Sequence, residues 1–324
     1  MYKKLVTFIN IYRLFKQGQL MTGFKNIIFF SFVFLIFSNL AAQDKFPVLK
    51  GPYLGQKPPE DKAVLFAPGI VKNCPSFTPD RTEFYFRGND LPGIIFMKLD
   101  NNRLSSPQNI SFSTGLYSDY NPHLSPDGKK LVFASNRPVT QGGKPKDDPD
   151  IYIVERAKNG WSVPVRFNNN INSPKTEGCP TLSESGNLYF FSDRKGGQGF
   201  DIYVSNLING KYQNPNNLGP SINTRFDEVD PFIAPDESYL IFCVRGREDG
   251  FGNNDLYISF RTGDNSWTEP VNMGEKINTN AEELFPRTSN DGRYLFFSST
   301  RRGKMEVFWI DAKIIEDLKR ESLK

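Results

Sequence analysis

The sequence predicts an all-β protein, and within that class a five-bladed β-propeller. Two apolar segments separated by a polar turn recur five times along the 324 residues, each time opening with a proline at an interval of 47 to 58 residues. The copies begin at Pro75, Pro122, Pro180, Pro231 and Pro286. A period of roughly 40 to 50 residues, with several short strands in each unit, is typical of propellers.

Each copy contains four short strands. The two apolar segments are followed by an acidic residue that opens a third strand, as in "DIYIV" from Asp150 and "DIYVS" from Asp201, and then by a fourth strand that ends in a turn such as "NNNIN". Short apolar runs cut by Gly, Pro, Asn and Asp predict strands and hairpins rather than helices. Because a four-stranded sheet has two apolar faces, several such sheets pack face to face around an axis.

Closure of the ring is predicted from its two ends. The last copy ends at "EVFWIDA" and is followed by a polar tail, residues 313–324, without a fourth strand. A single strand, "DKAVLFAPGIV" from Asp61, stands alone before the first copy. We expect this N-terminal strand to complete the C-terminal blade, so that residues 44–312 form one five-bladed domain. A six-bladed ring is the alternative and would need another blade within residues 44–74.

The first 43 residues have the pattern of a secretory signal peptide. Lys25 precedes an apolar run from Ile27 to Phe37, and "SNLAAQ" then supplies small residues for cleavage. The run is shorter than the roughly 20 residues that span a bilayer, so no retained span is predicted. Met21 is an alternative start.

The charge that remains after this segment argues against nucleic acid as a partner. The chain carries 40 basic and 36 acidic residues, and five of the basic ones lie in the segment that would be removed. The predicted mature protein is therefore close to neutral, whereas binding to nucleic acid needs a basic face.

The repeats resemble a known family. "PHLSPDGKKLVFASNR" followed by "DIYIV", and "CPTLSESGNLYFFSDRKGGQGFDIYVS", look like the WD-like propeller repeat of the Pro-Asp type, found in the propeller of the Tol-system protein TolB and in many exported bacterial proteins. The resemblance covers roughly residues 60 to 312. It implies a TolB-like propeller and protein or cell-wall glycan partners in the periplasm. The motif residues themselves are structural.

Acidic residues three positions before the opening prolines are the candidate binding site. First strands line the channel of a propeller, so we expect these side chains at the channel mouth, where clustered carboxylates attract cations. The alternative is that each carboxylate caps backbone amides in its own blade-to-blade loop. The candidates are Asp119, Glu177, Glu228 and Glu283, with Lys72 in the first copy.

A second recurring set is predicted to be structural. Arginines close the second strands and acids open the third strands, which suggests ion pairs or loop-fixing hydrogen bonds between adjacent strands. The arginines are Arg137, Arg194, Arg245 and Arg301, and the acids are Asp150, Asp201, Asp255 and Glu306. A catalytic residue need occur only once, so repetition argues for a structural role.

The sequence indicates neither a catalytic residue nor a cofactor. His123 is the only histidine, which leaves one candidate base for a histidine-dependent hydrolase and excludes zinc sites with several histidines. Calcium is kept as a possibility because two long loops contain carboxylates, the ligand type it prefers; these are Asp147, Asp148, Asp150, Glu248, Asp249 and Asp255.

The function that the sequence favours is a non-enzymatic binding or assembly module, periplasmic or secreted, for an envelope protein or glycan. The alternative is a propeller glycoside hydrolase using carboxylates around the axis. The sequence names neither the ligand nor the oligomeric state.

Overall fold

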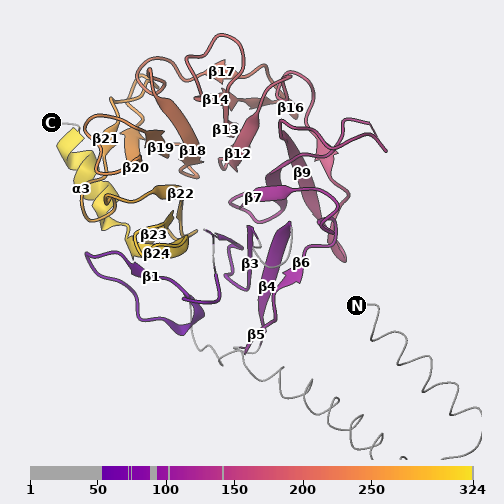
Figure 1. Ribbon diagram of the computed structural model, residues 1–324, viewed down its shortest axis with the longest axis horizontal. Helices are drawn as coiled ribbons and strands as arrows, with labels where there is room; N and C mark the ends of the chain where they lie inside the picture. Colours follow the sequence, from indigo (N-terminus) through magenta and orange to yellow (C-terminus); the bar gives the residue numbers. More distant parts are fainter. Residues whose placement is uncertain are drawn as a thin grey trace, which may run out of the picture. The chain divides into compact units, whose positions relative to one another are not determined.

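The computed structural model describes residues 53–71, 73, 75–87, 93–100, 103–140 and 142–322, all within one compact unit. Five antiparallel sheets surround a common centre, toward which the first strands of the blades are turned (Figure 1). The predicted five-bladed propeller is confirmed. The predicted signal peptide and Lys72 lie outside the described residues.

The blades follow one another along the chain, and each contributes its strands from the centre outward. Blade one contains β2 (Ser76–Phe77), β3 (Glu83–Arg87), β4 (Ile94–Asp100), β5 (Arg103–Leu104) and β6 (Gln108–Asn109). Blade two contains β7 (Asp119–Leu124), β8 (Lys130–Ser135), β9 (Asp150–Ala157), β10 (Gly160–Trp161) and β11 (Val165–Arg166).

Blades three and four repeat this order. Blade three contains β12 (Glu177–Leu182), β13 (Leu188–Ser192), β14 (Asp201–Ser205) and β17 (Asn216–Asn217), with a small hairpin of β15 (Leu207–Ile208) and β16 (Lys211–Tyr212). Blade four contains β18 (Asp227–Ile233), β19 (Tyr239–Arg245), β20 (Asn254–Phe260) and β21 (Val271–Asn272).

Blade five is closed by the N-terminal strand, as the sequence predicts. It contains β22 (Glu283–Thr288), β23 (Tyr294–Ser299), β24 (Glu306–Asp311) and, at its outer edge, β1 (Val64–Leu65). Val64 pairs with Trp309, and Leu65 with Phe308. Phe66 follows and is fully buried, with its ring centroid 5.0 Å from that of Phe296 and 5.9 Å from that of Phe77. The seam therefore joins blade five to blade one through aromatic packing.

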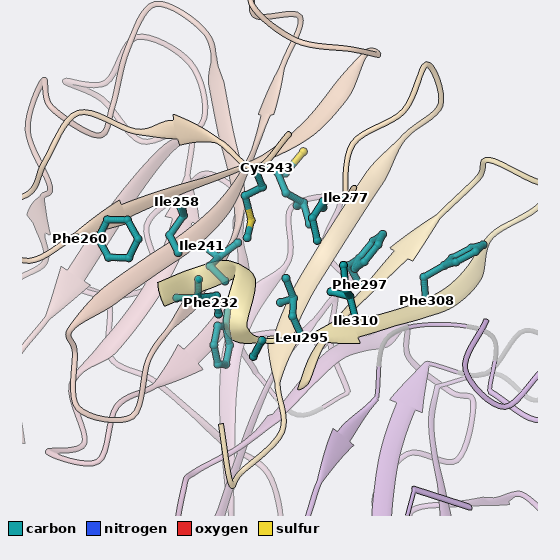
Figure 2. Close-up of a cluster of buried hydrophobic side chains, with 14 of the residues drawn as sticks. Phe232, Ile241, Cys243, Ile258, Phe260, Ile277, Leu295, Phe297, Phe308 and Ile310 are labelled. Carbon is teal, nitrogen blue, oxygen red and sulfur yellow. The ribbon is translucent and has the colours of Figure 1, made fainter. Parts of the chain in front are cut away.

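Residues 313–322, expected as part of a polar tail, form helix α3 (Lys313–Ser322). Ile315 is buried, and Ile314 and Leu318 pack on the apolar cluster between blades four and five. Figure 2 shows this cluster, with Ile241 and Ile258 on one side and Phe297 and Ile310 on the other. The helix forms because these apolar residues recur at helical spacing and share one face. None of the helices in the described part of the chain is long and apolar enough to cross a bilayer.

Each inner strand from blade two to blade five contains a β-bulge. The residue two positions after the candidate acid has a positive φ, between 44° and 54°, and the pairing with the second strand shifts register there. These residues are Asn121, Cys179, Asp230 and Phe285. A bulge turns side chains away from the regular alternation, which determines what occupies the axis.

Candidate functional site

The four candidate acids occupy equivalent places, at the first or second position of the inner strands β7, β12, β18 and β22. All are buried, with exposed fractions of 2% for Asp119 and 0% for Glu177, Glu228 and Glu283. Buried carboxylates need hydrogen bonds or a cation to offset the loss of water. Their partners show how each blade supplies these.

In three blades the carboxylate joins the incoming loop to the second strand. Glu283 accepts hydrogen bonds from the backbone N–H and hydroxyl of Thr279, both 2.8 Å, and from Ser299 Oγ, 2.7 Å. Arg301 Nη2 lies 3.2 Å from the same carboxylate. Glu177 has the same set of contacts with Ser173, Ser192 and Arg194. Asp119 is bound by Ser113, Ser135 and Arg137.

These contacts resemble the loop-capping alternative more closely than an open ligand site. In blades three and five, the backbone N–H of the residue four positions earlier donates to the carboxylate, and a serine on the second strand bonds to it as well. The hypothesis that the four acids bind an external ligand stays a prediction.

The expected pairing between the arginines and the third-strand acids is wrong. Arg137, Arg194 and Arg301 contact the acids that open the first strands instead. The register explains this, because Ser135 pairs with Asp119 on one side and with Asp150 on the other, and the arginine two residues later folds back over the inner strand.

The third-strand acids have other partners. Asp150 forms ion pairs with Lys146 and Arg166, and Asp201 accepts a hydrogen bond from Asn217. Asp255 accepts backbone hydrogen bonds from Phe251 and Gly252, and Glu306 lies within ion-pair distance of Arg302 and Lys304. The third-strand acids therefore hold the loops between the second and third strands in blades two, four and five, and in blades two and three they also contact the fourth strand through Arg166 and Asn217.

Blade four departs from the pattern at Glu228. Its partner on the second strand is Val244 rather than serine, and Gly246 stands where the other blades have the arginine. Arg245 lies one position earlier and reaches Asp227, at 3.5 Å. The Glu228 carboxylate accepts hydrogen bonds from the backbone N–H and the hydroxyl group of Thr224. Burial, and to a smaller extent the negative charges of Asp201 and Asp227, raise the pKa of Glu228 to about 7.

We expect Glu228→Gln to stabilise the protein at pH 8 and to leave it nearly unchanged at pH 4. The carboxyl is protonated in both states below its unfolded pKa of 4.5, so the folded state keeps that stability there and loses it as pH rises through about 7. This difference corresponds to at most about 3 kcal/mol. Urea unfolding at both pH values measures it. Glu283→Gln is the matched control and should destabilise at pH 8, because its carboxylate is paired with Arg301.

The bulge residues bring a different set of side chains together at the axis. Asn121 Nδ2 donates to Cys179 Sγ, and the Cys179 thiol donates to Asp230 Oδ1 over 2.7 Å. The backbone N–H of Phe285 donates to the other oxygen of Asp230, at 3.4 Å. These contacts run from β7 through β12 and β18 to β22. Burial raises the pKa of Asp230 to about 6 and the pKa of the Cys179 thiol.

The next layer along the inner strands is polar in every blade except blade four. His123, Thr181, Phe232 and Arg287 lie two positions after the bulge residues, and Ser76 holds the same place in blade one. Thr181 Oγ1 accepts from the Ile233 N–H at 3.4 Å, and Ser76 Oγ from the Leu124 N–H at 2.9 Å. The Thr181 and Ser76 side chains therefore each tie their blade to a neighbouring one.

The sequence did not single out these axial residues as a site. Their side chains differ from copy to copy, so they do not stand out as a repeated motif. The variation itself could have indicated them. A position that differs among otherwise similar copies is one where a ring of repeats can carry a unique side chain.

Carboxylate chemistry at the axis is limited by this arrangement. Glycoside hydrolysis commonly uses two carboxyl groups on either side of the scissile bond. Of the described bulge residues, Asp230 alone carries a carboxylate, and the four candidate acids are engaged within their blades. Within the described ranges, no group of three or more His, Cys, Asp or Glu residues is arranged to hold a metal ion.

Comparison with known proteins supports the fold. No family model and no curated protein matches the sequence. An endo-arabinase from Bacteroides thetaiotaomicron is similar over 79% of this chain and 96% of its own, with 14% identity and a TM-score of 0.51. A thermostable family-43 glycoside hydrolase gives 11% identity and a TM-score of 0.50, over 75% of this chain and 89% of its own.

TolB proteins are also among the structural neighbours. TolB from Acinetobacter baumannii has 16% identity and a TM-score of 0.44 over 72% of this chain. The matched region spans about half, 53%, of that protein. At these identities the likeness concerns the fold alone, which defines the class of protein as a five-bladed β-propeller. Function has to be argued from the residues.

Proposed function

We propose that the chain is a non-enzymatic binding or assembly module, exported to the periplasm or secreted, whose partner is an envelope protein or glycan. The proposal includes the predicted signal peptide and the WD-like repeats of the Pro-Asp type. It follows the general rule that a propeller is a rigid support whose function resides in sites added to it.

The proposal rests on one observation, namely that the acids of the inner strands are engaged in contacts within the protein. Asp119, Glu177 and Glu283 are buried and each is bound by an arginine and by hydroxyl groups of its own blade. Acids that serve hydrolysis are placed in a cleft, in different environments that separate their pKa values. Equivalent acids locked in equivalent contacts support a framework role and therefore a binding protein.

One end of the ring offers a surface for a partner. Loops that enter the inner strands and loops that join second to third strands emerge at the same end, because Asp119, Ser135 and Asp150 are paired there. Three large apolar side chains on these loops are exposed: Leu116 by 71%, Val139 by 60% and Phe251 by 48%. Ser118 N–H donates to Asn136 Oδ1 at 2.8 Å, which ties the loops of Leu116 and Val139 together. Exposed apolar residues on two loops that are held together by a hydrogen bond are suited to bind another protein.

The test is affinity capture from envelope extract with the full chain and two variants. We expect Leu116→Ser combined with Val139→Ser to reduce capture of the partner at least tenfold without lowering the unfolding midpoint, since both side chains are exposed. Ile208→Ser is the control, because Ile208 is 52% exposed and lies in the hairpin that follows the opposite end of β14.

Equal capture by all variants would reject this surface. Soluble sugar released from a polysaccharide panel by the wild-type protein, and abolished by Asp230→Asn, would favour the hydrolase instead.

A further inference from the structure

A small cavity lies on the axis, on the side of the inner-strand hairpins. It has a volume of about 40 Å³ and is lined by residues from all five blades, including Ser76, His123, Leu182, Phe232 and Arg287. One water molecule needs roughly 10 to 15 Å³ of cavity volume. The cavity therefore has room for about three waters, or for a ligand of about three non-hydrogen atoms. Asn290, in the blade-five hairpin, is exposed and also lines it, which places the opening at the hairpin end.

The charge of the lining is one-sided. Arg287 is 7% exposed and is the one charged side chain among the described residues that line the cavity. Its Nη2 donates to the carbonyl oxygen of Pro122 at 3.5 Å. Asp230 lies in the adjacent layer of the axis and interacts with Arg287 electrostatically, but it does not line the cavity. Arg287 therefore supplies the charge of the lining, and a buried guanidinium is suited to bind carboxylates.

Neutral donors accompany the guanidinium. His123 Nδ1 accepts the Leu182 N–H at 3.3 Å, so the neutral ring carries its proton on Nε2 and can donate from there. Burial and the charge of Arg287 lower the pKa of His123 well below its usual value, which keeps this ring neutral. Ser76 Oγ accepts the Leu124 N–H at 2.9 Å, and a hydroxyl group that accepts in this way can also donate its own hydrogen.

We propose that this cavity binds the carboxylate group of a small anion, of the size of formate, with Arg287 as the charged partner and His123 and Ser76 as neutral donors. The volume limits the ligand to about three non-hydrogen atoms within the cavity, and the lining favours a negative charge. The site is separate from the proposed partner surface at the other end of the ring and does not rest on the proposed function.

The single histidine makes the proposal testable by NMR. The full chain labelled with ¹⁵N-histidine gives one imidazole spin system, which lies in the cavity. Titration with sodium formate at constant ionic strength and pH should produce a saturable shift of the His123 nitrogens. Sodium pivalate, whose branched carbon skeleton exceeds the cavity, should produce none. A matching saturable response to both anions would show a surface effect and overturn the proposal, as would the absence of saturation with formate.

A pair of variants separates the cavity from general charge effects. Arg287→Gln should weaken formate binding at least tenfold. Arg293→Gln removes the same charge from an exposed side chain in the same hairpin and should leave formate binding unchanged. Equal affinity in wild type and Arg287→Gln would contradict the proposal. If Arg287→Gln does not fold, the comparison of formate with pivalate on the wild-type protein still decides the outcome.

Discussion

Phe66→Ala is expected to reduce the free energy of unfolding by about 4 kcal/mol, as is usual for truncating a buried phenylalanine. Phe66 is fully buried, and its ring packs against Phe77 of blade one and against Phe296 and Trp309 of blade five. The change would leave a cavity at the seam, where β1 pairs with β24 and closes the ring. Urea unfolding followed by tryptophan fluorescence reports on it, because Trp309 lies in the seam.

Val64→Ala is the control for this prediction. Val64 belongs to the same strand and pairs with Trp309, but its side chain is 42% exposed. We expect a loss below about 1 kcal/mol, since little apolar surface leaves the interior. Similar losses in the two variants would contradict a specific contribution from the aromatic seam.

Arg301→Met is expected to destabilise the protein by about 3 to 5 kcal/mol at pH 8, because it leaves the buried carboxylate of Glu283 without its cation. The methionine keeps much of the side-chain volume, so the loss reports on charge. Arg301 also donates to the carbonyl oxygen of Ile277, and its guanidinium lies over the ring of Phe308 at 4.6 Å. Chemical unfolding at pH 8 measures the loss.

Two companion variants test the cause. Arg302→Met removes the same charge from the neighbouring residue, whose side chain is 53% exposed, and should cost below about 1 kcal/mol. Arg301→Met combined with Glu283→Gln should recover part of the loss, since no buried charge then remains unpaired. A double variant that is less stable than Arg301→Met alone would show that hydrogen bonds to Glu283 matter more than its charge.

The blade count and the closing strand could be predicted because both depend on periodicity. Every copy needs the same turn, the same apolar alternation and the same strand ends, so the sequence repeats them. The pairing of β1 with β24 followed from a copy that lacks its last strand and an unassigned strand at the other end.

The sequence does not predict features that occur in one copy only, or contacts that do not recur from copy to copy. Arg245 resembles the other arginines in sequence, but it lies one residue short of their position, and Gly246 occupies that place. Helix α3 was missed because its three apolar positions are few among charged residues, and the cluster that they cover is formed by distant strands. The axial contact between Cys179 and Asp230 joins residues 51 positions apart through bulges that periodicity does not reveal.

The strand that closes the ring has a consequence for how the chain reaches its native state. Val64 and its partner Trp309 come from opposite ends of the domain, so this pairing forms only after almost all of the domain is available. Contacts so distant in sequence slow folding, because a large loop has to close before they form. Until then β24 has an unpaired edge on which another chain can add a strand. We expect aggregation during refolding to rise with protein concentration and to be suppressed by a soluble peptide that carries the sequence of residues 61–71.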